Sequence, residues 1–415
     1  MTVFAFSPEA NYQLLTDTDT FHPSAVNGPD TPAFRVLTGG FFTIGGDQYR
    51  PIRRLLLPAF HKQRVESYLS TMVAYTNLML ERWNPGETRD MCKEMQLLTL
   101  YIANKALFGL NASDETDNLG LLLQRWLNLA VSPATLVRWN QPFTPYGQLI
   151  RHADRVVTTI RALIARQRAA GARGDDMLSM LIQTVDEGGQ QLTDDELVSN
   201  AGGLFIAGHE TSSHALSWTL LLLALHPHIL ADLVDELSAV LGGGAPTIAH
   251  LDRLPLLDCV IKESMRLLPP ASMLGRIAMQ ETELEGFAIP EGTEIIYSPY
   301  ITHRIPSIFE RPLAFNPERW QTIKPSPYAY LPFSAGPRMC LGAAFATLEL
   351  KVILALLLQR YRVELPDGAV INRRLVMMLS PTPELPMRIH PQDRQFARRQ
   401  PAVRGKIRTM VQLAT

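Results

Sequence analysis

Apolar residues recur along this chain mainly at the three- and four-residue spacings of helices that are buried on one face. The longest helix pattern runs from residue 193 to residue 225. Thr193 and Glu196 have the spacing of a capping box at its start, and Pro227 marks its end. Its length, on the order of 45–50 Å at about 1.5 Å per residue, is enough to cross a whole domain. The clearest single apolar stripe consists of Leu341, Phe345, Leu348, Val352 and Leu356.

Prolines and glycines divide the rest of the chain into shorter elements. Ser7 and Pro8 predict a helix start. Between residues 65 and 185, helical patterns are interrupted at Pro85-Gly86, Pro133, Pro142–Pro145 and Gly171–Gly174. Extended or strand-like runs are predicted at Val3–Phe6, Thr282–Ile289, Glu294–Tyr297 and Tyr328–Pro332, with a turn at Pro366–Gly368 and a loop at Leu379–Pro381. The pattern predicts a mainly α-helical protein with small β-sheets.

Composition narrows the class of protein. The 415 residues are 46% hydrophobic and 19% charged, which is typical of a globular protein with a large core. A net charge of −1 gives no electrostatic basis for binding nucleic acid. The charge-free run Ala215–Leu225 is too short to span a bilayer, and no basic region followed by an apolar core marks a signal peptide. Three scattered cysteines, at positions 92, 259 and 340, do not form a disulfide framework and favour a reducing cytoplasm.

The loop before the apolar stripe contains the strongest candidate for chemistry. Cys340 lies just ahead of a predicted helix start, where unpaired backbone N–H groups and the helix dipole both favour a thiolate. Gly336 and Gly342 suit a tight turn or a close approach to the backbone, and Arg338 adds a positive charge. A lone cysteine in such a place is more often a buried structural residue.

A second candidate lies in the middle of the long helix, in the stretch Ala207-Gly208-His209-Glu210-Thr211. A glycine in a helix interior costs about 1 kcal/mol relative to alanine, so it calls for a reason. The hydroxyl of Thr211 can bond a local carbonyl and loosen the helix, which leaves a groove. The alternative is a packing glycine beside an incidental polar pair.

Two further groups share a helix face. Tyr49 and Arg53, at i and i+4, could bind an anion, although a basic cluster here would more often be solvated. Glu263 and Arg266, at i and i+3, would in most proteins be a surface pair.

Together these motifs resemble the cytochrome P-450 family, because Phe333-x-x-Gly-x-Arg-x-Cys-x-Gly342 matches its haem-binding loop without a gap. The resemblance implies that the Cys340 thiolate is the ligand of haem iron. It also implies that the other residues of the motif, Phe333, Gly336, Arg338 and Gly342, form the loop that binds the haem. It implies propionate contacts from Tyr49, Arg53 and Arg276. In the oxygen-binding motif with Gly208, it implies that Thr211 donates a hydrogen bond to dioxygen and that Glu210 relays protons. It also implies a structural network of Glu263, Arg266 and Arg319, and a supporting position for His303-Arg304 that does not contact the haem directly. The substrate pocket would include Ala207, Ala271, Ser272, Met273 and Leu274.

The resemblance further implies one domain, residues 1–393, that holds haem b and inserts one oxygen atom from O2 into an apolar molecule such as a fatty acid or terpenoid. Electrons would come from a ferredoxin or flavodoxin with its reductase, docked around Arg50, Arg54, Lys62 and Arg338. Family members usually carry a first helix and two strands before this start, so the N-terminal edge is expected to be missing. Residues 394–415 form a basic tail, expected to be disordered rather than a docking site. The alternatives are a haem-thiolate peroxygenase or isomerase, and a non-catalytic haem-binding protein.

Overall fold

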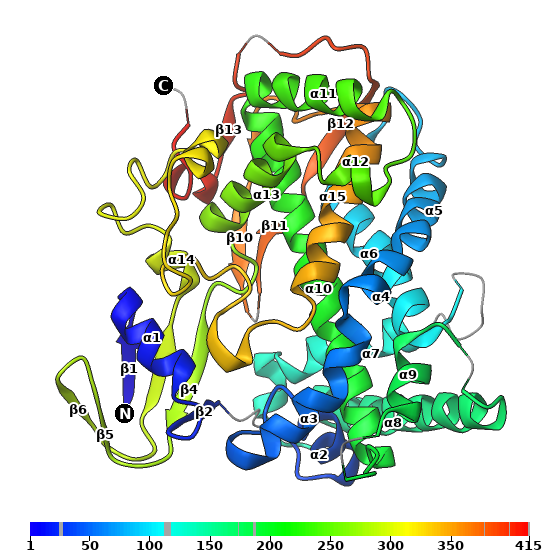
Figure 1. Cartoon of the computed structure of the whole chain (residues 1–415), viewed down its shortest axis with the longest axis vertical. Helices are drawn as coiled ribbons and strands as arrows, with labels where there is room; N and C mark the ends of the chain where they lie inside the picture. Colours follow the sequence, from blue (N-terminus) through cyan, green and yellow to red (C-terminus); the bar gives the residue numbers. More distant parts are fainter. Residues whose placement is uncertain are drawn as a thin grey trace.

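A computed structural model describes residues 1–24, 28–111, 118–172, 174–185, 188–376, 378–397 and 399–413. Its central element is the long predicted helix, α10 (Asp194–Leu225), which runs through the middle of the molecule (Figure 1). Thr193 and Glu196 form the expected capping box at its start. Because α10 contacts helices on several sides, it brings together segments that are far apart in the sequence.

Most of the remaining chain is helical. Before α10 come α1 (Pro8–Thr16), α2 (Pro32–Thr38), α3 (Tyr49–Leu56), α4 (Lys62–Ser67), α5 (Leu69–Leu80), α6 (Met91–Phe108), α7 (Asn118–Ala130), α8 (Pro145–Ala169) and α9 (Met177–Gln183). After it come α11 (Pro227–Leu241), α12 (Ile248–Leu251), α13 (Pro255–Leu267), α14 (Pro299–Thr302) and α15 (Ala343–Arg360). The interruptions predicted from proline and glycine lie between these helices.

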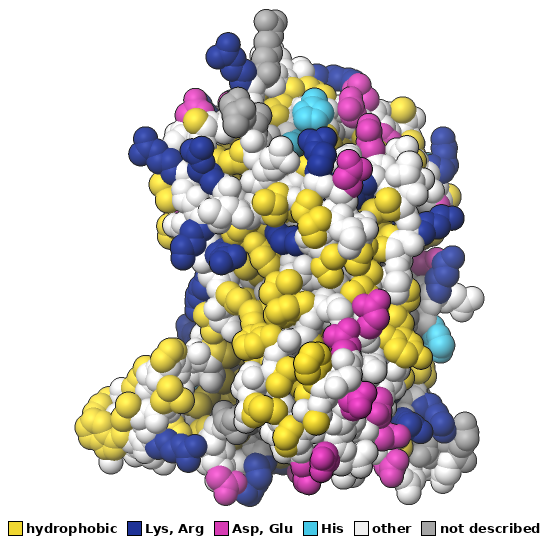
Figure 2. All heavy atoms as spheres, turned by 90° about the vertical axis from the view of Figure 1, so that its left-hand side faces the viewer, with side chains coloured by type: hydrophobic (Ala, Val, Ile, Leu, Met, Phe, Trp, Pro, Cys, Tyr) yellow, Lys and Arg dark blue, Asp and Glu magenta, His cyan; other side chains and the backbone are white. Residues whose placement is uncertain are grey.

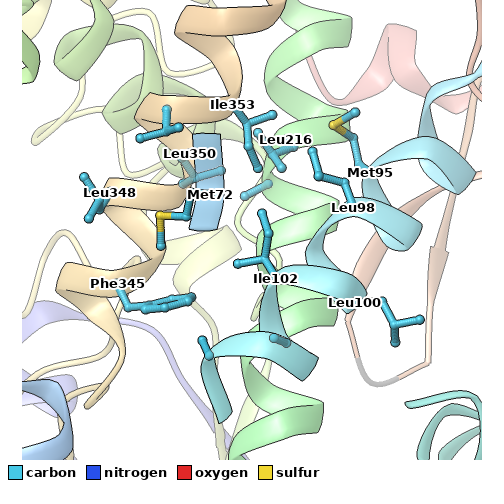
Figure 3. Packing of buried hydrophobic residues seen from close by; sticks show 14 of the residues in the cluster. Met72, Met95, Leu98, Leu100, Ile102, Leu216, Phe345, Leu348, Leu350 and Ile353 are labelled. Carbon is cyan, nitrogen blue, oxygen red and sulfur yellow. The ribbon is translucent and has the colours of Figure 1, made fainter. Parts of the chain in front are cut away.

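The main core forms where α5, α6 and α15 pack around α10 (Figure 3). Met72 of α5, Ile102 of α6, Leu216 of α10 and Ile353 of α15 are fully buried there. The stripe expected from Phe345 to Leu356 is buried on α15, as its spacing predicts. Burying side chains of this size stabilises the fold by roughly 1.5–3 kcal/mol each.

The strands are short and form small sheets. They are β1 (Thr2–Ala5), β2 (Phe21–Pro23), β3 (Thr88–Asp90), β4 (Leu274–Ala278), β5 (Thr282–Leu284), β6 (Phe287–Ile289), β7 (Glu294–Tyr297), β8 (Tyr361–Glu364), β9 (Ala369–Val370), β10 (Asn372–Leu375), β11 (Leu379–Thr382), β12 (Pro386–Pro391) and β13 (Val403–Arg404). The largest sheet has the order β1-β7-β4-β2, and β1 pairs parallel with β7 while β4 is antiparallel to both neighbours. This sheet lies beside the helical part, on the left in Figure 1.

Three predictions about local structure are wrong. Tyr328–Pro332 is not extended but follows turns, because backbone N–H groups of Ala329 and Tyr330 bond to Ser326. Leu379–Pro381 is not a loop but part of β11, which pairs with β10. The basic tail is not a disordered extension in its described part: β13 pairs with β9, and the tail buries Ile407, Met410 and Val411.

No single described helix is both long and apolar enough to cross a membrane. The pair α10 and α11 would pass such a test only together, and it is bent by 111°. On the surface, apolar side chains gather in broad areas between scattered charges, as Figure 2 shows for one face.

Candidate functional site

Cys340 lies two residues before the N-cap of α15, as the sequence predicts, and its backbone N–H donates to the Phe333 carbonyl at 2.9 Å. Its side chain has exposed surface, yet surrounding protein desolvates the sulfur and raises the pKa of the thiol. A side chain that has accessible surface, yet is surrounded by protein atoms, lines a space inside the molecule. The Gly342 N–H and the Arg53 charge oppose the pKa rise, as expected at a helix start, but burial outweighs them. A bound metal cation is the kind of charge that deprotonates such a thiol.

The loop around Cys340 is held in one conformation. Gly336 has a φ of +70°, and a Cβ there would lie 2.3 Å from the Leu15 carbonyl oxygen of α1, so glycine is required. Arg338 ties the loop to the segment before α3, donating to the carbonyls of Ile44 at 2.9 Å and Phe41 at 3.0 Å. The loop is therefore clamped between α1 and the α3 region.

A cluster of cations surrounds the buried ring of Tyr49. The guanidinium carbon of Arg338 lies 3.7 Å from the ring centroid and that of Arg53 lies 6.0 Å from it. Burial, with the nearby charges of Arg276 and Arg53, lowers the pKa of Arg338 to about 10. Arg276 is buried on β4, and its Nε has no hydrogen-bond partner among the described residues. Among those residues, none of the three arginines forms an ion pair with a carboxylate.

This cluster fits an anionic group. Three guanidinium groups that repel one another, one of them with an orphaned buried N–H, need negative charge close by to be stable. The two propionates of a haem would supply it. The Tyr49 hydroxyl accepts from Arg53 at 2.8 Å and donates to the Pro337 carbonyl at 3.2 Å. It therefore orients Arg53 and the loop beside the arginine cluster.

The middle of α10 also borders open space. Most of this helix is buried, but Ala207, Gly208, Glu210 and Thr211 are only partly so. A Cβ placed on Gly208 would meet nothing within 4 Å. Thr211 Oγ1 donates to the Ala207 carbonyl at 2.6 Å, the local bond expected from its position. Thr211, three residues after Gly208, therefore lies on the same side of α10 as the glycine that leaves room beside the backbone, and Glu210 precedes it in the chain.

Burial sets the charge states of this part of α10. Desolvation raises the pKa of Glu210, and the charge of Arg374 opposes this rise. His209 was given no ligand role from the sequence, and it is buried with its Nδ1 3.0 Å from the Phe205 carbonyl. Burial lowers the pKa of His209 to about 4, so it is neutral near pH 7. Burial therefore favours the protonated form of the Glu210 carboxyl group.

The structure brings together the three members of the expected network. Arg266 donates to both oxygens of Glu263, at 2.9 and 2.8 Å, and Arg319 Nε donates to Oε1 at 2.9 Å. Glu263 and Arg266 are fully buried, so this is not the surface pair that its spacing alone would suggest. Trp320 adds an indole N–H to Glu263 Oε2 at 3.0 Å.

His303 connects this network to the cysteine loop. Arg266 Nη1 donates to the His303 carbonyl at 2.9 Å, and the backbone N–H of Leu331 donates to His303 Nε2 at 2.7 Å. Because Nε2 accepts, Nδ1 carries the proton and donates to the Arg266 carbonyl, and burial lowers the pKa of His303 to about 3. Leu331 precedes the loop by two residues. A neutral, fixed imidazole thus joins Glu263 and its arginines to the backbone that leads to Cys340.

Four of the five expected pocket residues, 271 to 274, lie between α13 and the start of β4, and Ala207 lies on α10. Ala271 and Leu274 are partly buried, Met273 is exposed and Ser272 is buried. The Ser272 carbonyl accepts a hydrogen bond from Ser298 at 2.7 Å, which anchors this crossing to the start of α14. Arg276 follows two residues later, so the segment that reaches the arginine cluster also carries these apolar side chains.

Comparisons with known proteins agree with this geometry. The family model for cytochrome P-450 matches residues 1–388. Cyclooctatin synthase of Streptomyces melanosporofaciens is 31% identical over 93% of this chain and 85% of its own length. A putative cytochrome P-450 139 of Mycobacterium tuberculosis is 33% identical over 77% of this chain and 76% of its own. A cyanobacterial CYP120A1 with bound retinoic acid has a TM-score of 0.83 at 27% identity, covering 94% of this chain and 88% of that one.

The chain belongs to the cytochrome P-450 family. Its fold is the cytochrome P-450 fold, its cofactor is haem b, and it is a monooxygenase. The donor set described above fits that cofactor, since it offers one open cysteine sulfur and an arginine cluster without counter-charge.

Two polar residues of this P-450 were missed from the sequence. Glu349 of α15 is fully buried, neither of its oxygens has a hydrogen-bond partner among the described residues, and burial raises its pKa to about 8. A carboxylate inside the run Leu348-Glu349-Leu350 was the signal that could have revealed it. Arg374 influences Glu210 from β10 and could not be found from the sequence, because only the tertiary fold brings the two close.

Proposed function

We propose that this cytochrome P-450 inserts one oxygen atom from O2 into an apolar small molecule, a fatty acid or a terpenoid, with electrons from a separate ferredoxin or flavodoxin and its reductase. The observation that carries the proposal is the carboxyl–hydroxyl pair Glu210–Thr211 beside the open position of Gly208. A peroxide-driven enzyme has no need of such a proton-carrying pair.

The chain would hold haem between its two candidate surfaces. Cys340 would supply the thiolate ligand, and Arg53, Arg276 and Arg338 would bind the propionates. When bound, the haem supplies dioxygen activation and oxygen-atom transfer, chemistry that no side chain here could perform. The fixed loop keeps the sulfur in place, since Gly336, Arg338 and the His303 connection all restrict it.

Glu210 and Thr211 would move protons into this space. A carboxyl group whose pKa is raised by burial takes up a proton more readily than an exposed one and can pass it on. Thr211 Oγ1 would receive and redirect that proton through its hydroxyl. The bond to the Ala207 carbonyl fixes the orientation of this hydroxyl, and it must break or rotate when Thr211 donates elsewhere.

Apolar surface supports the substrate class. Among large apolar side chains, Leu136, Val137, Trp139 and Phe143, between α7 and α8, are 81%, 68%, 56% and 68% exposed. The names of related proteins mention cyclooctatin, leukotriene B4 and retinoic acid, all of which are largely apolar. The Ala271–Leu274 segment would line the inner part of the pocket.

An exposed basic surface near α3 supports an acidic redox partner. The side chains of Arg50 and Lys62 are 65% and 84% exposed, and each has one weak surface ion pair, with Asp19 and Glu66. Arg54 is exposed beside them. The prediction that Arg338 belongs to this surface is wrong, because its guanidinium points inward onto Tyr49. Three free cysteines suit a reducing, cytoplasmic compartment.

The test is turnover of an apolar substrate that shifts the haem spin state. With labelled ¹⁸O2, ferredoxin, reductase and NADPH, the proposal expects product that contains one labelled oxygen. Turnover with peroxide alone, and none with the electron-transfer proteins, would instead identify a peroxygenase.

A further inference from the structure

We propose that residues 136–143, which lie between α7 and α8 and are called the 136–143 segment below, dock the protein on an anionic lipid surface. The docking does not depend on the proposed function. Only its use, the delivery of an apolar substrate from the lipid, rests on that function. Three features of the segment support the docking: its outward apolar side chains, its fixed backbone and its charge.

The 136–143 segment turns its apolar side chains towards solvent. All eight of its residues are exposed. It contains three of the five most exposed large apolar side chains in the described part of the chain, those of Leu136, Val137 and Phe143. Trp139 is also more than half exposed, and its ring packs edge-on against Phe143 with the centroids 5.5 Å apart. A run of exposed apolar side chains is unfavourable in water and marks an interaction site.

Polar groups near the segment fix its backbone. Thr144, the N-cap of α8, is buried, and its hydroxyl accepts from the Gly147 N–H at 3.1 Å and donates to the Gln141 carbonyl at 2.9 Å. A Cβ on Gly147 would lie 1.9 Å from the Gln141 carbonyl oxygen, so the segment lies directly against the first turn of α8. Arg151 of α8 also donates to the Pro142 carbonyl. The apolar side chains are therefore held outward by a fixed backbone.

The charge of this region has one sign. Residues 118–153 contain Arg125, Arg138 and Arg151, and they contain no aspartate or glutamate. Arg138 lies within the 136–143 segment, is exposed, and has no ion pair among the residues that the structure describes. The next carboxylate along the chain is that of Asp154, in the third turn of α8. Apolar side chains combined with unpaired cations are complementary to an anionic membrane surface.

The β5–β6 hairpin shows that exposure alone does not give this combination. Its Phe287 is 73% exposed, compared with 81% for Leu136. The hairpin, however, carries the carboxylates of Glu283 and Glu285 and no cation. An anionic lipid surface would repel this hairpin and attract the 136–143 segment.

A lipid surface fits the segment better than a second protein does. Stable interfaces between proteins take about 20–30 residues from each partner, whereas this segment provides eight. A bilayer needs no matching groove. Leu136, Val137 and Phe143 would enter the boundary between headgroups and acyl chains. Trp139 would stay at the level of the headgroups, and Arg138 would lie near their phosphates.

Docking through this segment would place the bilayer beside helices that pack on α10. A Cβ on Gly202 of α10 would lie 3.6 Å from Ile160 of α8 and 3.7 Å from Leu123 of α7. Gly202 precedes Gly208, which borders open space, by six residues. An apolar substrate dissolved in the lipid would therefore meet the protein at the two helices next to this part of α10.

The first experiment measures how the haem-loaded protein sediments with vesicles of phosphatidylcholine, alone or with an equal part of phosphatidylglycerol. We expect binding to the mixed vesicles that weakens at high salt, and a blue shift in the fluorescence of Trp139, the exposed one of the five tryptophans. Leu136→Ser should weaken binding about tenfold and Arg138→Gln about fivefold. Phe287→Ser, the matched control at a similarly exposed apolar residue, should bind as the wild type does. The carbon monoxide difference spectrum shows whether each variant has folded around its haem.

Two results of this experiment would overturn the docking. One is no binding to the mixed vesicles, and the other is an equal loss of binding in Leu136→Ser and Phe287→Ser. A wild-type dimer in analytical ultracentrifugation that Leu136→Ser dissociates would overturn it as well, because the segment would then face a second copy of the chain.

The second experiment compares a long-chain fatty alcohol dissolved in the mixed vesicles with the same alcohol supplied in cyclodextrin. We expect Arg138→Gln to raise KM about fivefold for the alcohol in vesicles, and to leave kcat and the KM for the alcohol in cyclodextrin unchanged. An equal rise in both KM values would overturn delivery from the lipid. Vesicle binding without any turnover by ferredoxin and reductase would contradict the proposed function and support the docking.

Discussion

Replacing Glu263 with glutamine should strongly destabilise this P-450, although the change removes only a charge and one acceptor atom. Glu263 is fully buried and accepts from Arg266, Arg319, Trp320 and the Asn316 backbone. In Glu263→Gln, one carboxylate oxygen becomes an NH2 group. The N–H groups that bonded to that oxygen then face the new NH2 group and have no acceptor. Arg266 and Arg319 also lose the negative charge that balances them.

The expected size follows from that geometry. Oε1 accepts from Arg266 Nη2, Arg319 Nε and Asn316 N, whereas Oε2 accepts from Arg266 Nε and Trp320 Nε1. Whichever oxygen is replaced, at least two donors face a donor. Removing one partner of a buried ion pair costs about 3–5 kcal/mol. Since whole proteins are stable by about 5–15 kcal/mol, this is a large part of the total.

Urea unfolding followed by circular dichroism gives the loss directly. Asp30→Asn is the matched control, because it breaks the Arg35–Asp30 pair, whose side chains are 63% and 85% exposed, and should cost about 0–1 kcal/mol. Haem retention should fall in Glu263→Gln as well, since His303 transmits the network to Leu331. A Glu263→Gln protein as stable as Asp30→Asn would refute the view that this network supports the cysteine loop.

Three other predictions concern the helices beside the site. Thr211→Ala should retain haem but release more peroxide per electron consumed. The control is Thr219→Ala, because the Thr219 hydroxyl also bonds the carbonyl four residues back, and this variant should not release more peroxide. Equal coupling of electrons to product in both variants would count against the proton path. Burial raises the pKa of Glu349 from 4.5 to about 8, so between these pH values the folded state keeps a proton that the unfolded state loses. The free energy of unfolding, measured from urea midpoints, should therefore fall as the pH rises through this range. Glu349→Gln should abolish this fall. Gly208→Ala should be as stable as the wild type or more stable, by up to about 1 kcal/mol, but should weaken the spin-state shift caused by substrate, because its methyl group enters open space. Gly336→Ala, with a Cβ 2.3 Å from the Leu15 oxygen, should lose stability instead.

Local patterns were enough to predict the main helices and the loop that carries Cys340. The capping box at Thr193 and the stripe on α15 are determined within a few residues, so they can be identified without tertiary information. The same holds for Thr211, whose bond to Ala207 lies within one helical turn.

The features that were wrong or missed depend on contacts between distant segments. Arg338 was expected at the surface, but the fold places Tyr49 beneath it. The basic residues of the tail suggested disorder, yet the apolar residues Ile407, Met410 and Val411 of the same segment are buried in the core. Trp218 bonds the β10–β11 hairpin to α10 through the Leu379 carbonyl, 161 residues further along the chain. Charge and composition along the chain contain no record of such pairings.

The most direct test of the account is the carbon monoxide difference spectrum of the dithionite-reduced protein. The account predicts a strongly red-shifted Soret band in the wild type and in Cys259→Ser, the control at another free cysteine, and its complete loss in Cys340→Ala. A band at the position typical of histidine- or thiol-ligated haem, or an unchanged band in Cys340→Ala, would contradict the assignment of Cys340 as the haem ligand.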